Sequence, residues 1–176
     1  MFGRRAGDDA ARHAKEAALP PLPAKPEEHV LDELNGILGR TSGDNAGDIR
    51  KELQDNMFDL AFVVRSEEGL TKMHSIIGGL RDRYDRIAIT DKSALYNTDL
   101  METVELGYLL DCAEALVGSA LARTESRGGH YREDHPLRDD ANWLKHSLAY
   151  RNDDGTIRLD YKPVKMGPYI PMERKY

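Results

Sequence analysis

The stretch TDLMETVELGYLLDCAEALVGSALARTES, residues Thr98–Ser126, is the longest helical pattern in the chain. Its apolar residues recur every three or four positions, which predicts one long helix with a continuous apolar face. Asp99 and Glu102 near its start suit the helix dipole, and Gly128 and Gly129 follow its end, where a left-handed residue closes a helix. The expected face consists of Leu106, Leu109, Ala113, Leu116 and Ala120, widened by Leu110, Val117 and Leu121.

Three shorter helical patterns precede this helix. The first follows Pro26 and ends at Gly39, the second spans about Asp48–Arg65, and the third spans about Glu67–Arg86, with Ser66 as its N-cap. Their apolar stripes are Val30, Leu31, Leu34, Ile37 and Leu38; Ile49, Leu53, Met57, Leu60 and Val64; and Leu70, Met73, Ile77, Leu80 and Tyr84. Three long helices with short connections predict a mainly α fold, an antiparallel three-helix bundle with a shorter helix before it.

Both ends of the chain differ from this bundle. Arg4 to Ala18 predict an alanine-rich helix with little apolar bulk, and the prolines that follow form a linker that no helix can cross. Near the other end, the Asp154-Gly155 turn signal and the alternation of Ile157, Leu159 and Tyr161 predict a β-hairpin. Trp143 is expected to anchor this hairpin in the core.

The expected organisation therefore has four segments. Residues 1–18 are a remnant helix of an upstream domain, and residues 19–26 are a proline-rich linker. Residues 27–127 form the helical bundle, and residues 128–176 form a C-terminal loop, the hairpin and an extended tail.

Composition excludes several classes of protein. The 176 residues suffice for one medium domain, and the net charge of −6, from 31 acidic and 25 basic residues, disfavours nucleic acid as a partner. The single cysteine, Cys112, excludes an intrachain disulfide, suits the cytoplasm and is expected in the core of the long helix. No stretch approaches the ~20 apolar residues of a membrane span, so direct membrane insertion is not expected.

Charged residues crowd the stretch after the long helix, around a Gly-Gly pair. A solvated loop would explain the charges but not their density, and no cofactor loop or nucleophile motif occurs elsewhere in the chain. We predict that acids and bases here pair with one another and with a partner surface, where the glycines let the backbone turn tightly. No catalytic, cofactor-binding or metal residues are predicted; the predicted docking residues are Arg123, Glu125, Arg127, Gly128, Gly129, His130, Arg132 and Asp134.

Two other interpretations remain open. His130, Asp134 and His135 offer nitrogen and oxygen donors for a metal in an autonomous helical protein, although their spacing matches no zinc pattern. The chain could also self-associate through the face that a missing partner leaves exposed.

Several stretches resemble the flavoprotein subunit of succinate dehydrogenase and fumarate reductase. The most specific is RTESRGGHYREDHP, residues 123–136, and its continuation RDDANWLKHSLAY, residues 138–150, resembles the same family. DKSALYNTDLMETVELGYLLDCAEAL, residues 91–116, is similar to the family's last long helix and the segment before it.

The two ends of the chain extend this resemblance. IPMERKY looks like the family's C-terminus, with Pro171, Arg174 and Tyr176 as the matching positions. FGRRAG, residues 2–7, looks like the end of the family's flavin-domain segment. The resemblance therefore covers essentially the whole chain.

The resemblance implies a parent that oxidises succinate to fumarate, passes hydride to FAD and sends electrons through iron–sulfur clusters to quinone. In the family, the residues that bind FAD and substrate lie upstream of FGRRAG. The chain is therefore expected to be a C-terminal third without cofactor, inactive alone, that docks to the flavin domain and the iron–sulfur subunit. The resemblance also implies a bacterial protein whose parent complex lies on the cytoplasmic face of the inner membrane. Fumarate reductase and L-aspartate oxidase are the alternative parents, although the latter generally lacks the long tail.

Overall fold

The computed structural model describes residues 2–152 and 154–172, which form two compact units, one up to Asn35 and one from Gly36 onward. The first unit contains helix α1, Phe2–Glu16, and most of helix α2, Glu28–Gly39, separated by a proline-rich segment without helix or strand. A helix occurs where the sequence predicted one, but it spans Phe2–Glu16 rather than Arg4–Ala18, and the predicted break follows it. No residue of α1 is buried.

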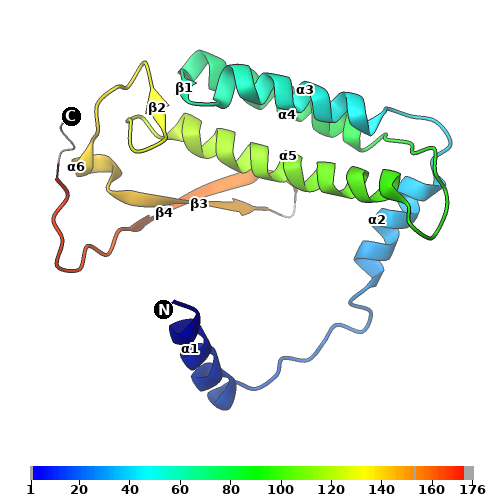
Figure 1. The fold of residues 1–176 in the computed structure, drawn as a ribbon, viewed down its shortest axis with the longest axis horizontal. Helices are drawn as coiled ribbons and strands as arrows, with labels where there is room; N and C mark the ends of the chain where they lie inside the picture. The colour runs from blue at the N-terminus through cyan, green and yellow to red at the C-terminus, as the bar shows by residue number, and fades with distance from the viewer. Residues whose placement is uncertain (1, 153, 173–176) are drawn as a thin grey trace. The chain divides into compact units, whose positions relative to one another are not determined.

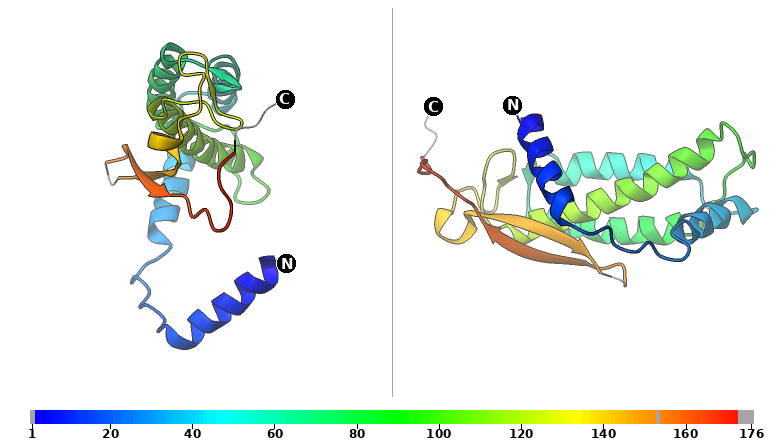
Figure 2. Two further views of the ribbon diagram at one scale, coloured as in Figure 1. Left: turned by 90° about the vertical axis from the view of Figure 1, so that its left-hand side faces the viewer. Right: turned by 90° about the horizontal axis from the view of Figure 1, so that it is seen from below.

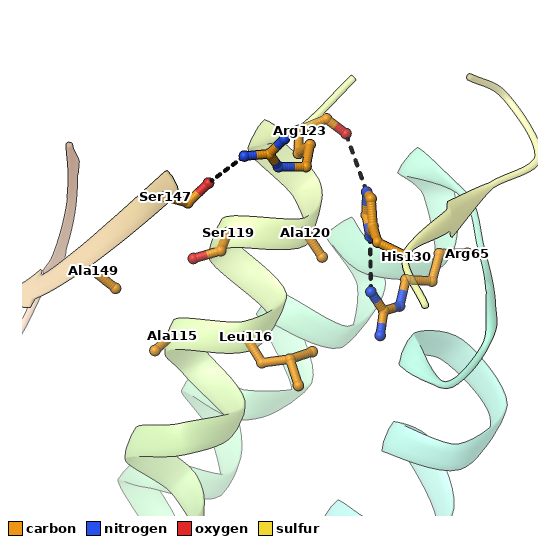
Figure 3. Close-up of a pocket in the computed structure, with 9 residues that line it drawn as sticks. All are labelled: Arg65, Ala115, Leu116, Ser119, Ala120, Arg123, His130, Ser147 and Ala149. Carbon is orange, nitrogen blue, oxygen red and sulfur yellow. Dashed lines mark hydrogen bonds between the residues drawn. The ribbon is translucent and has the colours of Figure 1, made fainter. Parts of the chain in front are cut away.

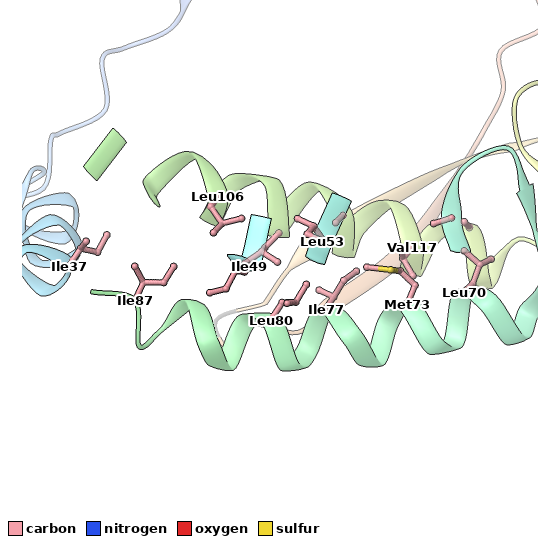
Figure 4. Packing of buried hydrophobic residues seen from close by; sticks show 14 of the residues in the cluster. Ile37, Ile49, Leu53, Leu70, Met73, Ile77, Leu80, Ile87, Leu106 and Val117 are labelled. Atoms are coloured by element: carbon pink, nitrogen blue, oxygen red, sulfur yellow. The ribbon is translucent and has the colours of Figure 1, made fainter. Parts of the chain in front are cut away.

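The second unit is built on three antiparallel helices, which confirms the predicted bundle (Figure 1). These are α3, Ala46–Ala61, α4, Glu67–Tyr84, and α5, Thr98–Ala122. Their facing sides share one apolar core, which Ile37 from α2 and Ile87 from the α4–α5 connector extend (Figure 4). Within the described residues, no helix is both long and apolar enough to cross a membrane.

Side-chain caps fix where the three helices begin. Ser66 accepts a hydrogen bond from the Gly69 amide at 3.1 Å, as the sequence predicted for α4. Asn97 caps α5, and Asn45 caps α3, which begins at Ala46, two residues before its predicted start. Each cap satisfies a backbone N–H that has no partner inside the helix.

The predicted end of α3 was wrong. The helix stops at Ala61, because Val64–Arg65 leave it to form strand β1, which pairs in parallel with strand β2, Tyr131–Arg132. Val64 is consequently exposed and does not belong to the apolar stripe. Pairing with a segment 67 residues away overrides the local helical periodicity.

The predicted end and face of α5 also need correction. The helix ends at Ala122, with Arg123 as its C-cap, and Gly128 and Gly129 form a separate turn beyond it. Leu109 and Leu116 are exposed rather than buried, and Cys112 is exposed rather than in the core. The buried face consists of Thr103, Leu106, Gly107, Leu110, Ala113, Val117 and Ala120.

The C-terminal hairpin is confirmed, and it runs alongside α5 (Figures 1 and 2). Strand β3, Lys145–Arg151, pairs antiparallel with strand β4, Ile157–Pro163, after the short helix α6, Asp140–Trp143. Arg151 from β3 and Arg81 from α4 both donate to Asp111 of α5, which ties the hairpin to the bundle. Trp143 packs edge-on against Tyr161 of β4, but it is half-buried and lies outside the main core.

Candidate functional site

Five of the eight predicted docking residues form ion pairs in the segment beyond α5, residues 123–140, here called the arginine corner; they are Arg123, Glu125, Arg127, Arg132 and Asp134. Its centre is Glu125, which is fully buried. Glu125 accepts hydrogen bonds from Arg123 at 2.6 Å, from Arg127 at 2.8 and 3.0 Å, and from the Asp139 amide at 2.8 Å. Burial alone would raise the pKa of Glu125, but the bonds from Arg127, Asp139 and Arg123 outweigh it and lower the pKa.

Arg123 joins the end of α5 to the hairpin. Its guanidinium donates to the carbonyl oxygens of Trp143 and Lys145 at 3.0 and 2.6 Å and to the Ser147 hydroxyl at 3.3 Å. The same group lies 4.9 Å from the centre of the Trp143 ring. Arg123 therefore holds β3 beside α5.

Arg132 and Asp134 join the end of α5 to the start of α4. The buried Arg132 guanidinium donates to the carbonyl oxygens of Ala120 and Leu121 at 3.1 Å, so it caps the C-terminus of α5. Asp134 accepts two hydrogen bonds from Arg132 and one, at 3.0 Å, from the Glu67 amide in the first turn of α4. The Arg132 bonds hold the pKa of Asp134 far below its usual range.

His130 is held neutral between two arginines, and one of them, Arg65, was not predicted as a site residue (Figure 3). Arg65 Nη1 lies 2.8 Å from His130 Nδ1, and a guanidinium can only donate, so Nδ1 accepts. His130 Nε2 then carries the proton and faces the Arg123 carbonyl oxygen at 3.4 Å. Burial, with the charges of Arg65, Arg132 and Arg123, lowers the pKa of His130 even though the Arg123 carbonyl opposes the shift. The parallel pairing of β1 with β2, which the sequence did not reveal, places Arg65 here.

Gly128 and Gly129 form the tip of a two-residue turn. The Arg127 and His130 backbones exchange hydrogen bonds of 2.8 and 3.0 Å across it. Gly128 has φ of 61°, a conformation that favours glycine, whereas Gly129 has no such requirement. Both glycines are exposed, so the tip is available to a neighbour.

The metal interpretation is not supported by this geometry. His130 is bound to Arg65 and does not join Asp134 and His135. Within the described residues, the one cluster with metal-ligand spacing is Glu67, Asp134 and His135, whose donor atoms lie within 4.8 Å of one another. Asp134 already accepts two hydrogen bonds from the buried Arg132 guanidinium, whose positive charge would repel a cation bound to the same carboxylate.

The described residues also do not fit a flavin. Among them, the only parallel pairing of strands is the two-residue β1–β2 pair, and the first-turn Glu67 amide of α4, which follows β1, already donates to Asp134.

One side of α5 is mostly apolar and is left uncovered by the described residues; Glu105, which lies on the same side, is exposed and 3.8 Å from Arg50. Met101, Tyr108, Leu109 and Leu116 are 58, 61, 40 and 41% exposed and, with Cys112 between them, share one face at helical spacing. We call these five residues the α5 outer face. Because the opposite side of α5 fills the core, the helix is apolar on nearly every side, which is typical of a helix covered on all sides in its assembled state.

Comparison with known proteins identifies the family. Residues 50–176 match the family model described as the C-terminal region of the fumarate reductase flavoprotein. This chain belongs to that family. The chain is 40% identical to the fumarate reductase flavoprotein subunit of Escherichia coli, over all of this chain and 30% of the relative. It is 39% identical to the succinate dehydrogenase flavoprotein subunit of Rickettsia bellii, over 94% of this chain and 28% of the relative.

A solved structure agrees with the sequence match. The E. coli quinol fumarate reductase superposes on 98% of this chain and 30% of its own, with a TM-score of 0.87 at 38% identity. The chain thus corresponds to a C-terminal portion of this flavoprotein family and spans about 30% of the length of these relatives. The predicted resemblance is confirmed, although Arg174 and Tyr176 lie outside the described residues.

Proposed function

We propose that this chain is the docking module of a flavoprotein subunit that interconverts succinate and fumarate. The relatives carry the names of both enzymes, fumarate reductase and succinate dehydrogenase. FAD and the substrate would be bound by the other part of the parent subunit, called here the flavin-binding part. The module would contact that part and the iron–sulfur subunit of a complex lying peripherally on the cytoplasmic face of the membrane.

The α5 outer face is the observation that carries this proposal. Burying exposed apolar surface contributes roughly 25 cal/mol per Å², and contiguous uncovered patches on soluble proteins mark interaction sites. The relatives are more than three times as long as this chain, which leaves ample protein to cover the face.

The residues of the arginine corner have two different roles in this proposal. Glu125 and Arg132 are buried and satisfied inside the chain, so they fix the shape of the corner. Arg127, the Gly128–Gly129 turn and Asp134 stay partly accessible and would make the contact, with His130 and Arg123 holding them in place.

Two measurements test the proposal. The purified chain should bind no flavin and should neither oxidise succinate nor reduce fumarate; yellow colour or turnover would refute it. Coexpressed with the flavin-binding part, the chain should copurify with it, and Leu109→Glu should abolish copurification without unfolding the chain. Leu95→Glu, which changes an equally apolar exposed residue of the α4–α5 connector, is the matched control and should copurify normally.

A further inference from the structure

Two shallow grooves meet at Arg65. One, of about 400 Å³, lies over α5 and is lined by Leu116, Ser119, Arg123, His130 and Ser147 together with Arg65 (Figure 3). The other, of about 350 Å³, lies between α3 and α5 and is lined by Gln54, Met57, Phe58, Phe62 and Leu116 together with Arg65. Because Arg65 and Leu116 line both, the grooves continue the α5 outer face up to Arg65.

The guanidinium of Arg65 differs from those of the arginine corner. Arg123, Arg127, Arg132 and Arg138 each have a carboxylate within salt-bridge distance. Within the part of the chain that the structure describes, no carboxylate lies within 4.0 Å of Arg65.

The contacts of Arg65 hold it without neutralising it. Its Nε donates to the carbonyl oxygens of Ala61 and Phe62, both at 2.9 Å, which caps the end of α3. Its Nη1 donates to neutral His130, and Nη2 has no hydrogen-bond partner among the described residues. Arg65 is thus a fixed, half-buried cation that lines both grooves, and its pKa is lowered by burial.

The surface beside Arg65 is apolar and aromatic. Phe58 and Phe62 are both exposed and stack with their ring centres 5.1 Å apart. Leu116 lines the same groove as the two rings and Arg65. An unpaired cation next to exposed aromatic rings is complementary to a carboxylate carried on an apolar segment.

We propose that Arg65 binds the carboxylate of an acidic side chain of the flavin-binding part, whose apolar neighbours cover Phe58, Phe62 and Leu116. This inference rests on the proposed function for the identity of the partner. Its chemistry, one carboxylate and one adjoining apolar group, rests on Arg65 and the grooves alone.

The test uses the chain itself with phenylacetate, which joins a carboxylate to an aromatic ring, and with its neutral analogue phenylacetamide. Titration followed by NMR at the Arg65 Nε–H and the Leu116 methyl groups should show saturable shifts with phenylacetate. The affinity for phenylacetamide should be at least on the order of tenfold weaker, because it lacks the charge. Absence of saturable shifts, or equal affinity for the two compounds, would overturn the proposal.

Variants locate the site. Arg65→Met should remove the preference for phenylacetate, and Phe58→Ala, at an exposed position, should weaken phenylacetate binding while leaving Arg65 intact. Arg158→Met, an exposed arginine on the outer side of the hairpin, is the matched control and should bind as the parent chain does. Unchanged binding by both Arg65→Met and Phe58→Ala contradicts the assignment.

The identity of the partner is tested separately. Arg65→Met should weaken association with the flavin-binding part by on the order of tenfold or more and reduce its dependence on salt. Association that Arg65→Met leaves unchanged overturns the Arg65 inference but leaves the docking function standing. Specific phenylacetate binding without any association overturns the docking function and the named partner, while the carboxylate site remains.

Discussion

Arg132 binds Asp134 through two parallel hydrogen bonds, with Nε 2.7 Å from Oδ1 and Nη2 2.6 Å from Oδ2. Arg132 is 1% exposed, so Asp134→Asn leaves a buried guanidinium without its counter-charge. The amide also loses part of the contact with the Glu67 amide at the start of α4. We expect the free energy of unfolding to fall by about 2–3 kcal/mol, measured by urea denaturation.

A weak ion pair provides the control. Asp160 lies 3.9 Å from Arg158 on exposed parts of β4, and Asp160→Asn should cost less than about 1 kcal/mol. The lowered pKa of Asp134 stabilises the fold above about pH 4, and this contribution is lost as the pH falls. The difference between Asp134→Asn and the parent chain should therefore shrink in acid. If Asp134→Asn and Asp160→Asn lowered the free energy of unfolding equally, Arg132 would not need Asp134 as its counter-charge.

His130 should make the stability depend on pH just below neutrality. Its pKa is lowered in the folded chain from an ordinary value of 6.5, so the unfolded chain takes up the proton first. The free energy of unfolding is then highest above pH 6.5 and falls as the pH drops below it. Urea denaturation at pH 7.5, 6.5 and 5.5 should show this fall, and His130→Gln should reduce it. A stability that rises between pH 7.5 and 5.5 would contradict the neutral state of His130 between Arg65 and Arg123.

Two glycines of α5 should respond oppositely to alanine. A Cβ at Gly107 would lie 2.5 Å from the Tyr84 hydroxyl oxygen, whereas a Cβ at Gly118 meets nothing within 4 Å. Gly118→Ala should be neutral or raise the free energy of unfolding by up to about 1 kcal/mol through helix propensity. Gly107→Ala should lower it by roughly 1–3 kcal/mol, because Tyr84 must move out of a packed core. Thermal denaturation followed by circular dichroism measures both; equal shifts would mean that Tyr84 does not pack there.

The two turn glycines offer a second matched pair. Gly128 has φ of 61°, so Gly128→Ala should cost about 1 kcal/mol, whereas Gly129→Ala should have little effect. The melting temperatures of the two variants compare them directly. If Gly129→Ala were the more damaging variant, the turn would have a different conformation.

The bundle could be predicted because its helices have regular periodicity and caps that act within a few residues. Ser66 lies directly before α4, and Leu70, Met73, Ile77 and Leu80 mark its buried face, all of which are local signals. The face of α5 was harder, because apolar residues occur almost all around that helix and the periodicity does not indicate which side is outside. Leu109 and Leu116 were assigned to the core for this reason.

The contacts within the site were harder to predict, because they join residues that are far apart in the sequence. The charge density of residues 123–134 was visible, but a linear sequence does not show which arginine meets which acid or that Arg132 would be buried. From its sequence pattern, Arg65 was expected at the end of a helix. In the structure Arg65 lies outside α3, because it pairs with Arg132 across β1 and β2, and this pairing has no local sequence signal. The contact of Arg65 with His130 follows from that pairing and has no local signal.

Alkylation of Cys112 tests the docking function most directly, because this single cysteine lies at the centre of the α5 outer face. Iodoacetamide labelling, followed by mass spectrometry of the Cys112 peptide, reports whether that face is covered. In the chain alone, Cys112 should react at nearly the rate of an unstructured thiol. With saturating flavin-binding part, the reaction should slow by on the order of tenfold or more, since the partner must leave before the thiol can react. The same rate in both samples would show that the α5 outer face is not where the two parts meet.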